Sequence, residues 1–319
     1  MPDTGFSGDA VNGDDMILPY ELYAPSVSPN PRKGSRHASE TTPNNNKCRT
    51  ILLIHTAFSA VGGLEYRDAG ITTPLAKAGY SVLALDLPSH ARASSIVPLT
   101  LDDAVRRVAA TVRKVTMAAI SSPAGADQVD EAGSAAAGDV RVHAVGVSLG
   151  AHVAAAFAAR HPELVATLFV SGFALFRPDF LGLRIVSSVA KWTVGSAEAL
   201  VAYMMNWKAP SAQLIEDVTN IIVSDWKIER IKCPTLIFVA TKFPSGDNVR
   251  DAQRLLGCVT LDGDWNGHHE RRSLIVKRRV PHPWHISDAP LFVEMVLAWI
   301  EGRRLPDEGK ESEVIGVIP

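Results

Sequence analysis

The chain alternates between short apolar runs and helical patterns along most of its length, and this alternation limits the folds open to it. Continuous apolar runs of about four to eight residues are typical of strands that are buried on both faces of a parallel sheet. Strands are predicted at 16–24, 51–55, 80–86, 140–147, 165–173, 234–240 and 273–280, separated by helical patterns at 69–78, 101–120, 150–162 and 289–302. The sequence therefore predicts an α/β fold with a doubly wound, mostly parallel sheet.

Two polar stretches and one apolar stretch interrupt this pattern. Residues 24–47 and 121–139 are rich in small and polar residues and predict flexible loops. Residues 174–226 have a helical and unusually apolar pattern that includes Phe, Trp, Tyr and Met side chains. We therefore predict one core, made of residues 1–173 and 227–319, with an α-helical lid of residues 174–226 inserted into it.

Composition and charge exclude several classes of protein. With a formal net charge of -2 over 319 residues, nothing favours binding to nucleic acid or to an anionic membrane. The N-terminal segment has no basic and apolar leader pattern, and charged residues interrupt the most apolar long stretch, at 181–205. Three widely spaced cysteines fit a reducing compartment. We expect a cytoplasmic protein without a membrane span, and the sequence leaves its oligomeric state unknown.

Ser148 lies at the centre of the pentapeptide Gly-Val-Ser-Leu-Gly at 146–150. The predicted strand 140–147 leads into the serine, and an Ala-rich helical pattern leaves it. A turn this sharp pushes the serine into a strained backbone conformation, and glycines two residues to either side keep the strand and the helix from colliding. Ser148 is therefore the candidate nucleophile.

A serine hydroxyl is a weak nucleophile until a histidine takes its proton and a carboxylate orients that histidine. Of the ten histidines, His282 is the preferred base, because it follows the predicted strand 273–280 and precedes the last helix. His285, three residues later, is the alternative. His152 is one helical turn beyond Ser148 and is expected to pack beneath the turn.

The segment around His282 resembles the C-terminal motif of the α/β-hydrolase superfamily, in which the catalytic histidine lies on the loop after the last strand. In that motif an aromatic residue opens the final helix about ten residues later, and Phe292 matches it. The segment 86–91 (Asp-Leu-Pro-Ser-His-Ala) is similar to a loop of the same superfamily that supports the fold rather than the chemistry. The resemblance runs from about residue 50 to 302, interrupted by the predicted lid.

The resemblance implies the chain order serine, acid, histidine for the catalytic residues. Asp247, after the predicted strand 234–240, matches the position of the acid. Asp262 and Asp264 are the alternates, and Asp251 suits the role less because it falls within the next helical pattern.

The resemblance also implies two backbone N–H donors that stabilise an oxyanion, those of Leu149 and Ala57. Here the chain departs from the family, because the common His-Gly is His55-Thr56. A β-branched residue restricts this loop. His55 itself is expected to be structural.

These residues predict a hydrolase of carboxylic esters or thioesters that works through an acyl-enzyme on Ser148. The apolar composition of 174–226 favours a small-molecule substrate with a hydrophobic acyl group. Alternatives are a thiohydrolase or acyltransferase beside a polyketide synthase, a C–C hydrolase with the same triad, and a non-catalytic small-molecule-binding protein of the same fold, which Thr56 favours. Without a phosphate-binding glycine loop or a metal-ligand pattern in the sequence, neither a cofactor nor a metal is expected.

Overall fold

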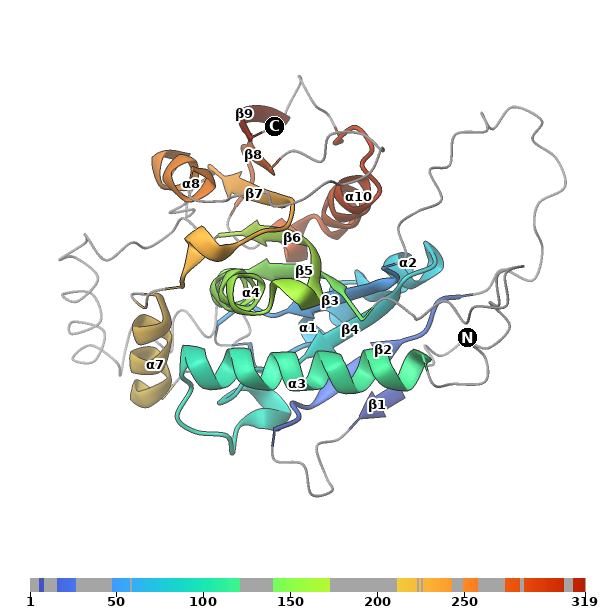
Figure 1. Ribbon diagram of the computed structural model, residues 1–319, viewed down its shortest axis with the longest axis vertical. Helices are drawn as coiled ribbons and strands as arrows, with labels where there is room; N and C mark the ends of the chain where they lie inside the picture. Colours follow the sequence, from blue (N-terminus) through green and yellow to red (C-terminus); the bar gives the residue numbers. More distant parts are fainter. Residues whose placement is uncertain are drawn as a thin grey trace, which may run out of the picture.

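The computed structural model of the protein is built around one continuous sheet (Figure 1). It describes residues 6–8, 16–26, 48–57, 59–120, 140–172, 211–222, 224, 226–242, 249–257, 273–281, 284–306 and 312–318. Within these ranges the sheet has nine strands in the order β1-β2-β4-β3-β5-β6-β7-β8-β9. The strands are β1 (Phe6–Gly8), β2 (Tyr20–Tyr23), β3 (Thr50–Ile54), β4 (Ser81–Leu85), β5 (Val142–Val147), β6 (Val165–Ser171), β7 (Thr235–Ala240), β8 (Ser273–Arg278) and β9 (Ser312–Ile318).

The central strands, from β4 across to β8, are all parallel to their neighbours, whereas β1, β2 and β9 are antiparallel. Every residue of β5, β6 and β7 is buried, as expected for strands covered on both faces. The prediction of a doubly wound, mostly parallel sheet is confirmed.

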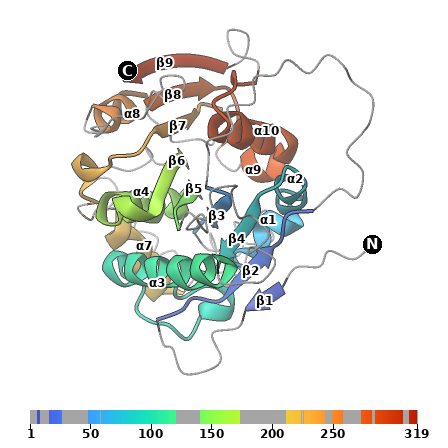
Figure 2. The same cartoon turned by 45° about the vertical axis from the view of Figure 1, so that its right-hand side comes forward.

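Helices cover both faces of the sheet (Figure 2). One layer contains α3 (Leu101–Ile120), α4 (Leu149–Arg160), α7 (Ala212–Ile222) and α8 (Val249–Leu256), and the other contains α1 (Leu64–Asp68), α2 (Thr72–Lys77), α9 (Trp284–Ser287) and α10 (Ala289–Ile300). Successive side chains of β3 point to opposite faces, as strand geometry requires. Leu52 and Ile54 join the core under α3 and α4, while Ile51 and Leu53 join the core under α2 and α10.

Each of the seven predicted strands overlaps an observed strand, from β2 to β8. Strands β1 and β9 were not predicted, and both lie at edges of the sheet. Strand β1 is too short to show an apolar alternation, and an edge strand has only one neighbour to impose such a pattern. The predicted helix 69–78 is α2, while α1 precedes it and ends at a turn in which Gly70 has a φ of 77°.

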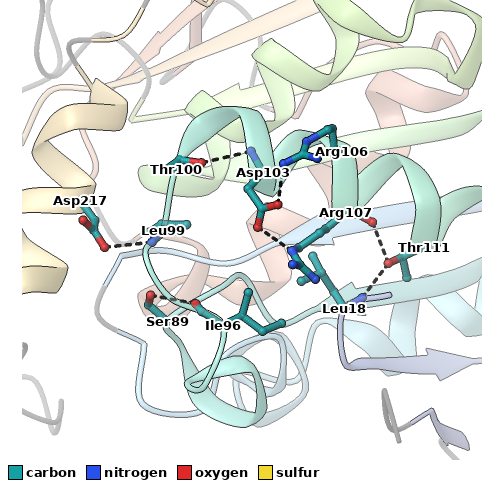
Figure 3. A network of polar contacts seen from close by, with 10 residues as sticks. All are labelled: Leu18, Ser89, Ile96, Leu99, Thr100, Asp103, Arg106, Arg107, Thr111 and Asp217. Carbon is teal, nitrogen blue, oxygen red and sulfur yellow. Dashed lines mark hydrogen bonds and ion pairs between the residues drawn. The ribbon is translucent and has the colours of Figure 1, made fainter. Parts of the chain in front are cut away.

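A hydrogen bond connects helix α3 to the segment that leads into β2 (Figure 3). The Leu18 N–H donates to the Thr111 hydroxyl over 2.9 Å, and that hydroxyl donates to the carbonyl of Arg107 over 2.8 Å. At the helix start the Asp103 N–H donates to the hydroxyl of Thr100, over 3.2 Å. The acidic first turn also suits the positive end of the helix dipole.

Helix α7 is the described part of the predicted lid, and it packs on the core. Val218, Ile221 and Ile222 belong to the apolar cluster under α3 and α4. On the same helix the buried carboxylate of Asp217 accepts the N–H of Leu99 over 2.9 Å (Figure 3). The rest of the predicted lid up to residue 210 lies outside the described residues, so the lid stays a prediction.

Cys48 and Cys233 are both buried. Within the ranges given above, no helix has both the length and the apolar character needed to cross a membrane. Those ranges also contain no group of three His, Cys, Asp or Glu side chains arranged to hold a metal ion.

Candidate active site

Ser148 occupies the turn between β5 and α4. Its backbone angles are φ 57° and ψ -118°, a conformation that residues with a side chain rarely adopt. Its N–H donates to the carbonyl of Ser171, the last residue of β6, over 2.8 Å. Ser148 is partly exposed although Val147 and Leu149, on either side, are buried. The strained turn therefore presents the serine at the carboxyl edge of the sheet, as the pentapeptide predicts.

The two glycines of the pentapeptide are required by close backbone contacts. A Cβ on Gly146 would lie 2.2 Å from the carbonyl oxygen of Gly150. A Cβ on Gly150 would lie 2.0 Å from the carbonyl oxygen of Ile54 at the end of β3. No side chain fits at such distances, so the crossing of β5, α4 and β3 depends on both glycines.

The loops that carry the other two candidate catalytic residues leave from the same edge of the sheet. Parallel strands end at one edge, and the predicted acid follows β7 while the predicted base follows β8. The N–H groups of Thr241 and Lys242 donate to the carbonyls of Arg278 and Val280, each over 2.9 Å, so the two exits run side by side. Asp247 and His282 themselves lie outside the described residues, as do the alternates Asp262 and Asp264.

Ser171 connects the turn at Ser148 to the segment that follows β8. Its backbone carbonyl accepts the N–H of Ser148, and its hydroxyl accepts the indole N–H of Trp284 over 2.8 Å. Trp284 is fully buried and stacks on Phe238 of β7, with 4.1 Å between the ring centroids. Trp284, two residues beyond His282 in the sequence, therefore contacts the same residue that holds the N–H of Ser148.

His285, the alternative base, lies in α9 and is fully buried. Its Nε2 is 3.3 Å from a carboxylate oxygen of Glu65, and its ring contacts those of Tyr66 and Phe292. Among the described residues no hydrogen bond joins it to Ser148, and its Nδ1 has no hydrogen-bond partner. These contacts orient His285 toward Glu65.

His55, at the end of β3, uses both ring nitrogens on backbone groups. The Leu87 N–H donates to Nε2 over 2.9 Å, so this nitrogen carries no proton. Nδ1 is then the protonated nitrogen, and it donates to the carbonyl of Thr56 over 2.7 Å. The ring of His90 lies 4.9 Å from that of His55, and burial lowers the pKa of His90 to about 4. His55 is thus a neutral link between two loops, which agrees with the structural role predicted for it.

Thr56, which departs from the family pattern, is held by Glu65 of α1. The N–H and the hydroxyl of Thr56 each donate to a different carboxylate oxygen of Glu65, both over 3.0 Å. Burial raises the pKa of this carboxyl, whereas His285, His55 and the N–H of Thr56 together lower it, so that its pKa is about 2. Glu65 is therefore ionised at neutral pH, which its role as acceptor at both oxygens requires.

The two candidate oxyanion donors come from segments in contact. Leu149 is the first residue of α4, where an N–H has no acceptor within its own helix. Ala57 follows Thr56 in a buried loop. The close approach of Gly150 to the carbonyl oxygens of Ile54 and His55 places the start of α4 against the residues that lead to Ala57.

Asp86 fixes the next part of the same loop. One of its carboxylate oxygens accepts the N–H of Gly63 over 2.8 Å, and the other pairs with Arg92 over 2.7 Å. Arg92 also pairs with Glu21 of β2 over 2.7 Å. A Cβ on Gly62, whose φ is 56°, would lie 2.4 Å from Asp86. This agrees with the prediction that the 86–91 segment supports the fold.

Glu65 does not belong to any motif in the sequence. Its place in the candidate site comes from hydrogen bonds with Thr56, nine residues earlier, and with His285, 220 residues later. A glutamate early in a helix has many ordinary explanations, and no pattern in one sequence links these three positions. The threonine in place of the usual glycine was the one available signal.

The model of the family described as "Alpha/beta hydrolase family" matches residues 51–303. An "AB hydrolase superfamily protein" of Gibberella zeae is 32% identical over 264 residues, which are 81% of this chain and 82% of that protein.

Solved structures show the same fold at low identity. The thioesterase domain from the curacin biosynthetic pathway is 13% identical with a TM-score of 0.55, over 92% of this chain and 99% of that one. E-2-(acetamidomethylene)succinate hydrolase is 12% identical with a TM-score of 0.56, over 93% and 99% of the two chains. With the family match, the sheet order and the strained serine turn agreeing, the chain belongs to the α/β-hydrolase family.

Proposed function

We propose that the protein is a serine hydrolase with Ser148 as nucleophile, His282 as base and Asp247 as the acid that orients it. The observation that carries this proposal is the backbone of Ser148, whose φ of 57° is retained at a partly exposed serine between two obligatory glycines. Such strain persists only where the surrounding structure enforces it, and it is typical of catalytic turns.

In the proposed mechanism His282 takes the proton of the Ser148 hydroxyl as the oxygen attacks a carbonyl carbon. The N–H groups of Leu149 and Ala57 stabilise the negative charge that develops on the carbonyl oxygen. The leaving alcohol or thiol receives the proton from His282 and departs, which leaves an acyl-enzyme. Water, activated by the same histidine, then releases the acid. The contact between Trp284 and Ser171 supports this arrangement, because Trp284 follows the proposed base by two residues in the sequence and Ser171 holds the N–H of Ser148.

The proposed substrate is a small molecule with a carboxylic ester or thioester and a hydrophobic acyl group. The apolar composition of the predicted lid, 174–226, supports the acyl preference. A thioesterase domain among the structures with the same fold is consistent with a thioester, although the shared fold does not define the substrate.

A fluorophosphonate probe and p-nitrophenyl esters of increasing acyl length test whether Ser148 is the nucleophile. We expect the wild-type protein to be labelled on Ser148 and to hydrolyse the esters, and Ser148→Ala to lose labelling and at least about 10⁴-fold in kcat. His282→Ala should show a loss of similar size. His285→Ala is the matched comparison, since it removes the neighbouring imidazole.

The outcomes separate the alternatives. A larger loss in His285→Ala than in His282→Ala, at equal folded protein, would make His285 the base. A wild-type protein that resists the probe, but whose melting temperature rises with a hydrophobic acyl compound, would indicate a binding protein instead of an enzyme. Thr56 is the residue that favours that second function, because it replaces the glycine usual in the oxyanion loop.

A further inference from the structure

A buried carboxylate lies directly behind the loop that carries one of the proposed oxyanion donors. Glu65 is 6% exposed, and both of its oxygens accept hydrogen bonds from a single residue of that loop, Thr56. A carboxylate buried at a chain turn is costly unless it is paired and hydrogen-bonded. Glu65 meets this condition with three donors, the N–H and hydroxyl of Thr56 and Nε2 of His285.

These contacts fix the peptide groups on both sides of Thr56. Glu65 holds its N–H, while His55 donates to its carbonyl over 2.7 Å. That carbonyl belongs to the peptide group whose N–H is that of Ala57. In a trans peptide the C=O and the N–H point in opposite directions, so anchoring the carbonyl sets the direction of the Ala57 N–H. The hydroxyl contact adds a third anchor, which a glycine at this position would lack.

We infer that Glu65 is a positioning residue for the oxyanion loop, acting through Thr56 to aim the N–H of Ala57 at the reacting carbonyl oxygen. This inference rests on the proposed function. The inference explains the threonine at position 56, where the family usually has a glycine. The hydroxyl of Thr56 donates to the carboxylate of Glu65, and a glycine has no such group. The loop is then held by the side chains of His55, just after β3, and of Glu65 in α1, where a glycine would leave it freer.

His285 contacts the same carboxylate through its Nε2. It lies on α9, next to the segment that carries the proposed base, and its contact with Glu65 links that segment to the oxyanion loop. The contact also matters electrostatically, because an unpaired negative charge on Glu65 would destabilise an oxyanion that develops nearby. The hydrogen bond from Nε2 of His285 offsets part of the charge of Glu65.

The test compares Glu65→Gln and Thr56→Val with the wild-type protein, using an ester substrate and a matching trifluoromethyl ketone. Glu65→Gln keeps the shape but removes the charge and one acceptor, and Thr56→Val removes only the hydroxyl. Misplacing an oxyanion donor weakens transition-state binding more than substrate binding. We expect kcat to fall roughly 10- to 100-fold in Glu65→Gln with KM within about threefold. The dissociation constant of the ketone, whose adduct carries an oxyanion, should rise by the factor that kcat/KM loses.

A double variant tests whether Glu65 acts through Thr56. The loss caused by Glu65→Gln should be smaller in the Thr56→Val background than in the wild type, because the two changes remove a shared contact. Rates are expressed per Ser148 that reacts with fluorophosphonate, so partial unfolding does not count as lost catalysis. If Glu65→Gln does not fold, Thr56→Val alone must show the matched change in kcat and ketone binding.

Asp103→Asn is the control for losing a hydrogen-bonded carboxylate. Asp103 pairs with Arg107 within α3, outside the proposed site, so its variant should leave kcat within about twofold. The inference is wrong if Ser148 reacts and the variants at Glu65 and Thr56 keep wild-type kcat/KM and ketone affinity. A wild-type protein that neither reacts with fluorophosphonate nor hydrolyses any ester overturns the proposed function, and the inference with it.

Discussion

Two steric requirements meet at the candidate nucleophile. Ser148 must adopt a positive φ, which costs free energy for a residue with a Cβ. Gly146 and Gly150 are needed because neither position has room for a Cβ. The N–H of Ser148 is held by Ser171, so β6 helps to maintain the strained turn. The pentapeptide therefore encodes both the fold of this crossing and the exposure of the hydroxyl.

A substitution separates the need for space from the need for an unusual φ. Gly150→Ala places a methyl group 2.0 Å from the carbonyl oxygen of Ile54, so α4 must move away from β3. We expect a loss of about 1–3 kcal/mol or more in the free energy of unfolding, measured with urea, together with slower fluorophosphonate labelling.

Gly302→Ala is the matched control for this substitution. Gly302 has a φ of 66° but nothing within 4 Å of an added Cβ. Its variant should lose only about 1–2 kcal/mol from backbone strain and should keep its labelling rate. Equal labelling rates in the two variants would contradict the steric account of Gly150.

At the scale of elements, α7 shows that an apolar stretch does not by itself define a lid. The stretch 174–226 was predicted as one insertion because its composition changes at its start. Its described C-terminal part places Ile221 and Val218 in the core, and Trp226 packs against His152 of α4 with 4.5 Å between the ring centroids. Composition cannot distinguish a helix that covers the sheet from one that covers a substrate.

A substitution in α7 tests whether this helix belongs to the core. Ile221→Ala removes a side chain that is 1% exposed and should lower the free energy of unfolding by about 2–4 kcal/mol, measured by urea titration. Asn220→Ala, at an exposed position of the same helix, should change it by less than about 0.5 kcal/mol. An Ile221→Ala protein as stable as the wild type would mean that α7 is not part of the cooperative core.

At the scale of the whole molecule, the ionised Glu65 makes stability depend on pH. Its pKa is about 2 in the folded protein against an ordinary value of 4.5. A depressed pKa adds stability that is present in full above pH 4.5 and is lost as the pH falls toward 2. The difference corresponds to about 3 kcal/mol. We expect the stability advantage of the wild type over Glu65→Gln to shrink by about this amount between pH 5 and pH 2, followed by urea unfolding. An advantage that does not change with pH would contradict this expectation.

The sequence predicted most of the sheet and the strained turn at Ser148 for physical reasons. Parallel strands buried on both faces leave continuous apolar runs, and a strained turn leaves glycines at fixed spacing around Ser148. Edge strands such as β9 and the short helix α1 leave weaker patterns. The contacts of Glu65 and His285 could not be predicted, because they depend on how distant segments meet. Asp247, His282 and the lid remain predictions.

The contact between Glu65 and His285 joins positions 220 residues apart, so it is among the last that a growing chain can form. During synthesis the serine turn and the strands around it emerge well before the segment that supplies α9 and the proposed base. Domains begin to fold as they leave the ribosome, and contacts this distant must overcome the entropy of closing a long loop. A chain released before residue 285 would therefore carry Ser148 and Thr56 without the contact that His285 makes with Glu65.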